Sequence, residues 1–196
     1  MAFNKNSFLE NSSKFELGMV HGRFQPFHKG HLEYVTAALN YCQKLVIAFT
    51  NPDKTLTKQE LLAPHRHLKE ANPFTLLERV TFIQETLIDD NIPLERIIFI
   101  SFPINLPDLW EYYITKEVVQ FIRIASPWEE EKAERFRRWG SVVKVLDSSN
   151  FKYSNLSATQ VRKKIFEKSD WTDLVPHCVA MNIQELIKKD SGRFSK

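Results

Sequence analysis

ELGMVHGRFQPFHKGH, residues 16–31, joins a short apolar run to a turn and then to the start of a helix. The turn contains Gly22, Pro26 and Gly30, and the helix is expected to begin at about Lys29. A strand that ends in such a turn and leads into a helix is the opening unit of a parallel α/β sheet. Ligands of these sheets bind beyond the carboxyl ends of the strands, so functional residues should lie just after a strand and at the start of a helix.

The alternation of apolar runs and amphipathic stretches continues along the chain. Strands are expected at residues 16–21, 44–50, 96–101, 118–125 and 141–146, which are short, mostly apolar on both faces and rich in Val, Ile and Phe. Helices are expected at residues 30–41, 76–89, 107–114 and 129–139, with two more at residues 157–168 and 170–188. This order predicts an α/β fold: a doubly wound, Rossmann-like, parallel five-stranded sheet with helices on both faces and a C-terminal helical segment.

The composition is that of a globular protein and excludes several classes. The chain has 196 residues, 43% of them hydrophobic, and we expect a polar N-terminal tail at residues 1–14 and a single domain at residues 15–190. No apolar run approaches the roughly 18–20 residues that cross a bilayer. The formal net charge of +3 lacks the basic excess of a nucleic-acid binder. Cys42 and Cys178 match no disulfide or zinc spacing, so we expect a cytoplasmic protein. The mild charge and the lack of a long apolar run predict neither nucleic-acid nor membrane partners.

The strongest functional signal is a pair of histidines at the start of the first helix. His28 and His31 are one helical turn apart and lie on one face, where unpaired backbone N–H groups already favour an anion. Gly30 lets a phosphate approach the backbone, and Arg23 adds a planar donor for phosphate oxygens. The segment has no nucleophile and no carboxylate pair, which predicts electrostatic handling of a polyphosphate. The structural alternative is that His28 caps the helix and His31 is a core histidine.

A second signal is LSATQVR, residues 156–162. Ser157 is a typical helix N-cap, which by itself is structural. Together with the helix amides, the hydroxyls of Ser157 and Thr159 can hold the terminal phosphates of a nucleotide, and Arg162 can reach the same oxygens. Because the segment starts another helix of the same α/β domain, we expect it to share one anion site with the first motif.

The polar connection at residues 51–73 interrupts the alternation of strands and helices. It is either a solvated insertion or a lid whose basic residues, Arg66 and Lys69 among them, reach over bound phosphates. His65 and His67 have no carboxylate or cysteine beside them, so no protein metal site is predicted.

The two motifs together resemble the HxGH nucleotidyltransferase superfamily and, more closely, its archaeal-type nicotinamide mononucleotide (NMN) adenylyltransferases. GRFQPFHKGHL, NPFT at residues 72–75 followed by Glu78 and Arg79, Trp110 and LSATQVR all match family landmarks. The resemblance implies transfer of AMP from ATP to NMN, giving NAD and pyrophosphate with Mg²⁺ as cofactor. It also implies a homo-oligomer.

The resemblance assigns roles to individual residues. The catalytic set that it implies is Arg23, His28, His31 and Arg162. The residues that it implies for nucleotide binding are Gly22, Phe24, Gly30, Ser157 and Thr159. For the acceptor substrate, Trp110 matches a tryptophan that stacks on the nicotinamide ring. Where the family's polar residues are missing, we expect Asn105 or Asp108, and Lys69 or Arg66, to supply the contacts instead.

Three positions depart from the family pattern, and all of them concern specificity. Pro103 stands where an aspartate commonly contacts the nicotinamide amide, and Ala71 stands where a basic residue commonly faces the substrate phosphate. The fourth strand ends in Ser126-Pro127-Trp128, where a proline removes a backbone donor near the base. The alternatives are therefore a cytidylyltransferase or another nucleotidyltransferase of this fold with a different phosphorylated substrate, or a nucleotide-binding module without turnover.

Overall fold

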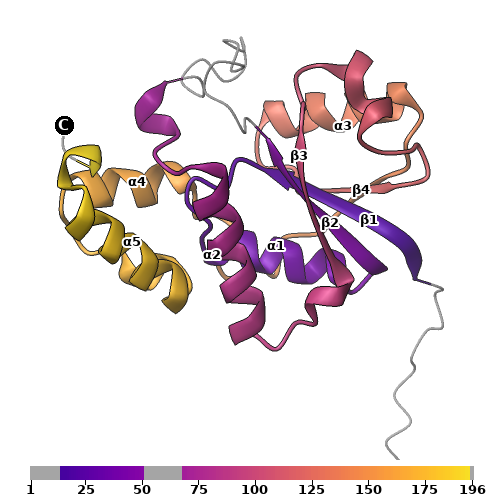
Figure 1. Ribbon diagram of the computed structural model, residues 1–196. Helices are drawn as coiled ribbons and strands as arrows, with labels where there is room; N and C mark the ends of the chain where they lie inside the picture. Colours follow the sequence, from indigo (N-terminus) through magenta and orange to yellow (C-terminus); the bar gives the residue numbers. More distant parts are fainter. Residues whose placement is uncertain (1–13, 51–67, 195–196) are drawn as a thin grey trace, which may run out of the picture.

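The computed structural model describes residues 14–50 and 68–194 (Figure 1). One parallel sheet has the strand order β3-β2-β1-β4-β5. Its strands are β1 (Phe15–Gly22), β2 (Cys42–Thr50), β3 (Ile97–Phe102), β4 (Val119–Ile122) and β5 (Val143–Val145). The predicted doubly wound, five-stranded α/β fold is confirmed.

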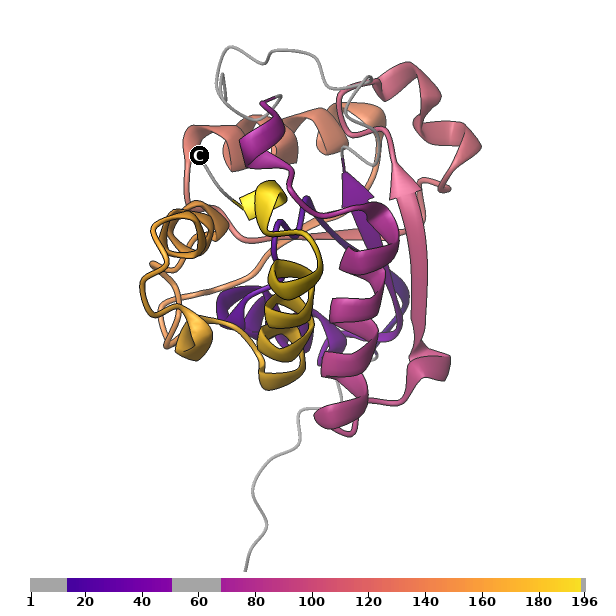
Figure 2. The ribbon, with the colours of Figure 1, turned by 60° about the vertical axis from the view of Figure 1, so that its left-hand side comes forward.

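Helices cover both faces of this sheet, as Figures 1 and 2 show. The α-helices are α1 (Lys29–Leu39), α2 (Leu76–Asp89), α3 (Pro127–Trp139), α4 (Ala158–Phe166) and α5 (His177–Lys189). Short 3-10 helices occur at Lys69–Ala71, Leu94–Arg96, Pro107–Tyr112, Thr172–Leu174 and Ser191–Phe194. None of the helices in the described residues is long and apolar enough to span a membrane.

Two hydrophobic clusters hold the layers together. On one face, Val20 and Ile47 of the sheet pack with α1, α2, α4 and α5, and α5 lies beside α2 in both views (Figures 1 and 2). On the other face, Met19 and Val46 pack with Trp110 and with α3. Because strand residues alternate between faces, the central strands β1, β2 and β4 are buried on both sides along most of their length, which explains their mostly apolar sequences.

Several predicted boundaries are wrong by a few residues. The strand predicted at 118–125 is only Val119–Ile122, because β4 pairs with β1 at Gly18 and Met19 and with β5 at three positions. The strand predicted at 141–146 is correspondingly Val143–Val145. The helix predicted at 107–114 is a 3-10 helix.

The predicted helix at 170–188 is split into a 3-10 helix and α5 by Pro176, which lacks an N–H and disfavours helical geometry at the preceding residue. Two predicted segments lie largely outside the described residues. The predicted tail at residues 1–14 is outside them except for Lys14. Of the polar connection at 51–73, residues 51–67 are outside, and with them Arg66, His65 and His67.

Candidate active site

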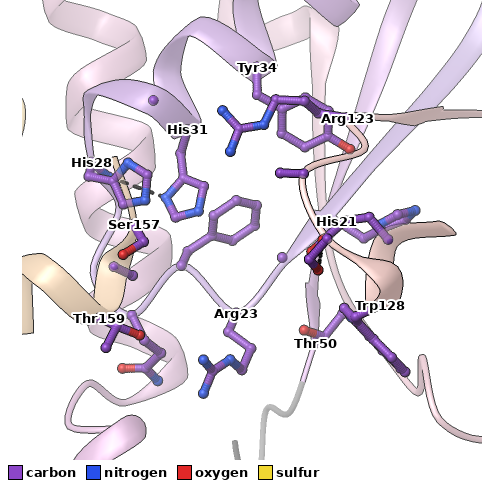
Figure 3. Close-up of a pocket in the computed structure, with 18 of the residues that line it drawn as sticks. His21, Arg23, His28, His31, Tyr34, Thr50, Arg123, Trp128, Ser157 and Thr159 are labelled. Atoms are coloured by element: carbon purple, nitrogen blue, oxygen red, sulfur yellow. Dashed lines mark hydrogen bonds between the residues drawn. The ribbon is translucent and has the colours of Figure 1, made fainter. Parts of the chain in front are cut away.

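A cavity of about 330 Å³ opens where the chain leaves β1 and β4, the strands at which the order of the sheet reverses. Its walls come from the turn after β1, the ends of β2 and β4, and the first residues of α1, α3 and α4. In Figure 3, His28, Ser157 and Thr159 lie on one side of the cavity, and His21 and Trp128 lie on the other. Doubly wound sheets bind their ligands at this position.

The turn after β1 is held by buried hydrogen bonds to distant segments. The amide of Gln25 donates to the carbonyl of Phe74 at 2.8 Å and accepts from the Phe74 N–H at 2.9 Å. Arg162 in α4 donates to the Gln25 carbonyl at 2.7 Å, and Arg79 in α2 donates to the Arg23 carbonyl at 2.8 Å. The first motif is therefore fixed in place by the segment before α2 and by the second motif.

Arg23 lies at the mouth of the site, close to the segment that precedes α2. Its guanidinium lines the cavity and donates to the carbonyl of Ala71 at 3.2 Å and to the side-chain oxygen of Asn72 at 3.4 Å. Behind it, Arg79 is 1% exposed, and burial lowers its pKa to about 10, so it still carries its charge near neutral pH. We infer that Arg79 positions the backbone of Arg23, while Arg23 itself faces the cavity.

The two motif histidines are in contact with each other. Their ring centroids are 3.6 Å apart, and the backbone N–H of His28 donates to Nδ1 of His31 at 3.4 Å. Burial, together with the charges of Arg123 and Arg162, lowers the pKa of His28 to about 3. Burial and the neighbouring His28, Arg123 and Arg23 lower the pKa of His31 well below its usual range. Both imidazoles are therefore neutral near pH 7.

The structural alternative for these histidines holds in part. His28 occupies the N-cap position of α1, as that interpretation predicts. His31 is only partly buried, and both rings line the cavity. Within the described residues, Nδ1 of His28 is buried without a hydrogen-bond partner. A polar ligand can therefore complete the hydrogen bonding of this pair.

The second motif reaches the same cavity from α4. Ser157 caps the helix, with its hydroxyl accepting from the N–H of Gln160 at 3.3 Å, and both Ser157 and Thr159 line the cavity. Arg162 is placed differently from the prediction, since it lies behind the wall rather than in it. Its guanidinium donates to Gln25 and, at 3.0 Å, to the hydroxyl of Thr159. Its charge acts on the site through His28, whose pKa it lowers.

Close packing explains the glycines of the first motif better than phosphate access does. A Cβ at Gly22 would lie 2.8 Å from the ring of Phe24, and a Cβ at Gly30 would lie 2.8 Å from the carbonyl oxygen of Tyr153. The ring of Phe24 is 1% exposed and packs against Phe49, so it shapes the wall and offers no face to a base. Gly22 and Gly30 both line the cavity.

The residues predicted to bind the acceptor do not come together as expected. Asn105 lines the cavity. Trp110 does not, and its prediction as a stacking platform is wrong for this structure. Its ring is fully buried, stacks on Phe136 with centroids 4.3 Å apart, and donates through Nε1 to the Pro103 carbonyl at 3.0 Å. Lys69 begins the 3-10 helix that ends at Ala71, and Arg66 is outside the described residues.

Among the cavity residues that sequence reasoning missed are three with titratable side chains: His21, Arg123 and Lys132. His21 is the next-to-last residue of β1, and Arg123 directly follows β4. Both belong to runs that were predicted only as apolar strands. A titratable side chain at the carboxyl end of such a strand could have indicated the site, because ligands bind there. Lys132 lies in α3, five residues after Pro127, in a helix whose charges look solvated.

The donor set fits a metal that is carried by the substrate. Among the described residues, no three or more His, Cys, Asp or Glu side chains gather into a group that could hold a metal ion. Mg²⁺ commonly binds through substrate phosphates and water, with few protein ligands. The carboxylate at the cavity is Glu129 in the first turn of α3, which accepts a hydrogen bond from Ser126.

Comparison with known proteins identifies similar sequences and folds. The family model described as cytidylyltransferase-like matches residues 19–164. The phosphonoformate cytidylyltransferase of Streptomyces viridochromogenes is 35% identical over 168 residues, which cover 86% of this chain and 90% of that protein. The nicotinamide-nucleotide adenylyltransferase of Pyrococcus furiosus is 30% identical over 171 residues, which cover 86% of this chain and 83% of that protein.

A solved structure shares the fold. It is a bifunctional NMN adenylyltransferase/ADP ribose pyrophosphatase from Francisella tularensis, with a TM-score of 0.67 and 18% sequence identity. The match covers 92% of this chain and 51% of that protein, so this chain spans about half the length of its structural neighbour.

Proposed function

We propose that this chain, which belongs to the cytidylyltransferase-like family and is a nucleotidyltransferase, transfers CMP from CTP to a small acceptor that carries a phosphate or phosphonate group. The acceptor oxygen attacks the α-phosphorus in line, the bond from that phosphorus to the bridging oxygen breaks, and pyrophosphate leaves with the electron pair. No covalent intermediate with the protein is required, because positioning and charge stabilisation supply the catalysis.

The observation that carries this proposal is the wall of the cavity on the α3 side. Trp110 and Phe136 are buried behind that wall, so the tryptophan at the family landmark offers no face to a nicotinamide ring. The polar and cationic side chains in this wall are His21, Asn105 and Lys132. Trp128 also lines the cavity, but it is 4% exposed and its ring lies 5.1 Å from the guanidinium of Arg135. Such a wall suits a small anion. The 35% identity to a phosphonoformate cytidylyltransferase supports the same class of acceptor and favours CTP as the donor.

The opposite side of the cavity suits the triphosphate. Two helix N-termini, those of α1 and α4, bring backbone N–H groups to this side, and anions bind at such ends. In the proposed arrangement Arg23 and His31 contact the α-phosphate, while His28, Ser157 and Thr159 contact the β- and γ-phosphates. The neutral imidazoles donate hydrogen bonds. Burial is the main cause of their low pKa values, and an arriving triphosphate offsets the positive charge of the neighbouring arginines that adds to it.

Mg²⁺ belongs to the proposal as the partner of the triphosphate. It neutralises phosphate charge when it is bound. Because the described residues offer no three-ligand cage, it would enter with the nucleotide rather than reside in the protein. Arg23 and Arg123, two of the cations that line the cavity, complete the neutralisation.

Transfer of AMP from ATP to NMN is the second candidate, and the NPFT segment favours it. Residues 72–75 match the adenylyltransferase landmark, and Phe74 of that segment is hydrogen-bonded to Gln25 of the first motif. The relative from Pyrococcus furiosus, at 30% identity, supports this candidate as well. Its weakness is the acceptor side, where Trp110 is buried and Pro103 and Ala71 replace polar family positions.

The test is a matrix of four nucleoside triphosphates against phosphonoformate and NMN, in the presence of Mg²⁺. Pyrophosphate release gives the rate, and mass spectrometry identifies the product. We expect pyrophosphate and a cytidylylated phosphonate from CTP and phosphonoformate. NAD formed from ATP and NMN at a higher rate would overturn the proposal in favour of the second candidate.

A further inference from the structure

We propose that His21 and Lys132 form a subsite for a carboxylate of the acceptor, so that the substrate is a small molecule with a carboxylate beside its reacting phosphate or phosphonate. This inference rests on the proposed function and names the acceptor class more narrowly. The carboxylate makes and breaks no bond in the reaction. It orients the acceptor so that the phosphonate oxygen faces the α-phosphorus.

The subsite lies on the opposite face of the sheet from the triphosphate contacts. Side chains alternate along a strand, so His21 shares a face with Met19, which packs in the cluster with α3. Lys132 belongs to that helix and also lines the cavity. His28 and Ser157 come from helices that pack on the other face, and Figure 3 shows them across the cavity from His21. A ligand bound at His21 therefore approaches the triphosphate from the opposite side, as an attacking group must.

Unsatisfied polar atoms mark the subsite as a place for a ligand. The imidazole of His21 is 4% exposed, and neither ring nitrogen has a hydrogen-bond partner among the other described residues. The side-chain oxygen of Asn105 is in the same condition. Leaving a buried polar group unpaired costs about 1–3 kcal/mol. The presence of two such groups in the wall of one cavity is explained if a polar ligand forms the missing hydrogen bonds.

The charges at the subsite favour an anion. Lys132 is 8% exposed, and its charge is close enough to His21 to lower the pKa of that imidazole, adding to the effect of burial. Arg123 lies at the same cavity, with one terminal guanidinium nitrogen buried and without a partner in the described residues. Among the described residues that line this cavity, the acidic one is Glu129, which is hydrogen-bonded to Ser126. Neutral His21 can donate one N–H to a carboxylate, and Lys132 supplies the opposite charge.

The back of the subsite limits the size of the bound group. The ring of His21 stacks on Phe136 with centroids 5.1 Å apart, and Phe136 stacks in turn on Trp110. This packed aromatic layer leaves no space behind His21 for a ring. A carboxylate needs no such space, because it can be bound at the edge of His21 by one N–H group and by the charge of Lys132.

The experiment compares acceptors with and without a carboxylate, using CTP, Mg²⁺ and pyrophosphate release. The acceptors are phosphonoacetate and methylphosphonate, and the variants are Lys132→Met and Lys132→Arg. For the unaltered protein we expect kcat/KM to be on the order of tenfold or more higher with phosphonoacetate. Lys132→Met should raise the KM for phosphonoacetate by a similar factor, leave the KM for CTP within about twofold, and remove the preference. Lys132→Arg, which keeps the charge, should retain part of it.

A matched control and a second variant separate binding from folding. Lys188→Met removes an exposed lysine near the end of α5 and should change neither KM. His21→Val removes both ring nitrogens and places a residue that suits a buried strand. It should weaken binding of phosphonoacetate to the CTP-loaded protein in calorimetric titration. Equal use of both acceptors by the unaltered protein, or an equal rise of both KM values in Lys132→Met, would overturn the subsite.

Failure of the proposed function gives a different result. In that case CTP releases no pyrophosphate with either phosphonate, for the unaltered protein as well as for the variants. Calorimetry still decides about the subsite, since phosphonoacetate must bind the unaltered protein and bind Lys132→Met on the order of tenfold more weakly. Absence of that difference would refute the inference on its own.

Discussion

His31 combines a packing role with a place in the cavity wall. Its ring stacks on His28 and packs edge-on against Phe24, and its Nδ1 accepts the backbone N–H of His28. These contacts fix the imidazole before a ligand arrives. A preorganised donor of this kind stabilises charge that develops in a transition state without having to reorganise.

Replacing His31 by alanine is therefore expected to lower kcat on the order of a hundredfold or more, the usual scale for a donor to transition-state charge. Pyrophosphate release at saturating CTP and acceptor measures the change. His177→Ala, which removes an exposed histidine at the start of α5, should leave kcat unaltered. Turnover within a few-fold of the parent in His31→Ala would contradict the role assigned to this imidazole.

The low pKa of His28 also predicts an acid dependence of stability. The folded chain holds this pKa at about 3, against 6.5 in an unfolded chain, so only the unfolded state takes up a proton between these values. The contribution to stability is fully present above pH 6.5 and is lost as the pH falls toward 3. The loss is about 1.4 kcal/mol per pH unit for one such group.

Urea denaturation at pH 8, 6 and 5 measures this loss of stability. The variant His28→Gln should show a shallower dependence of the unfolding free energy on pH than the parent does. Identical pH dependence in the two proteins would rule out a depressed pKa at this position.

Gln25 shows how the elements that carry the two motifs are joined. Its side chain makes two hydrogen bonds with the backbone of Phe74, and its carbonyl accepts from Arg162. One buried residue thus connects the turn after β1 to the N-terminus of α2 and to α4. Glu33 in α1 adds a further connection, because its carboxylate accepts the backbone N–H groups of Lys152 and Tyr153 at 2.9 Å each.

Gln25→Ala is expected to lower the free energy of unfolding by about 2 kcal/mol, because it removes two buried hydrogen bonds and leaves the backbone groups of Phe74 unpaired. It should also raise the KM for the nucleotide, since the turn that carries the histidines loosens. Gln43→Ala removes an exposed glutamine of β2 and should change stability by no more than about 0.5 kcal/mol. Equal stability of the two variants in urea would show that the bonds to Phe74 do not hold the turn.

The sequence predicted the elements well and their ends less well, for a physical reason. Periodicity reports which residues are apolar, and that was enough to find the strands and α-helices of residues 14–50 and 68–194. The end of a strand depends on how far its neighbour extends. β4 stops at Ile122 because β5 is only three residues long, and nothing within residues 118–125 contains that information.

The candidate site was predictable where short motifs carry it and unpredictable where distant packing decides. His28, His31, Ser157 and Thr159 lie at helix starts, and their place follows from local sequence. Trp110 matches a family landmark, yet Phe136, 26 residues further along the chain, covers its ring. Burial of that kind depends on the whole fold.

The C-terminal part of the described chain is tied to the rest of the molecule by Arg193. Its guanidinium donates to both carboxylate oxygens of Glu78, at 2.8 Å for one of them, and to the Pro73 carbonyl at 2.7 Å. Burial opposes ionisation of Glu78, but hydrogen bonds from Arg193 and from Thr75 hold the pKa of that carboxyl below its usual value. The last described helix and the N-terminus of α2 are therefore held together.

Arg193→Met is expected to lower the free energy of unfolding by about 1–3 kcal/mol, because it leaves a half-buried carboxylate without its cation. Arg138→Met breaks an ion pair with Glu131 in which the arginine side chain is 67% exposed, and it should cost no more than about 1 kcal/mol. Equilibrium denaturation in urea compares the two. If the two variants are equally stable, the pair of Arg193 and Glu78 contributes no more to the free energy of unfolding than a surface ion pair does.

The contact between Gly30 and the carbonyl oxygen of Tyr153 has a consequence for protein engineering. A single methyl group at position 30 would collide with the strand-to-helix connection that ends at Ser157, so α1 and that connection behave as one mechanical part. Anyone transplanting this pocket onto another scaffold must move both segments together. If either segment were transferred alone, even with its motif intact, half of the proposed nucleotide site would be out of position.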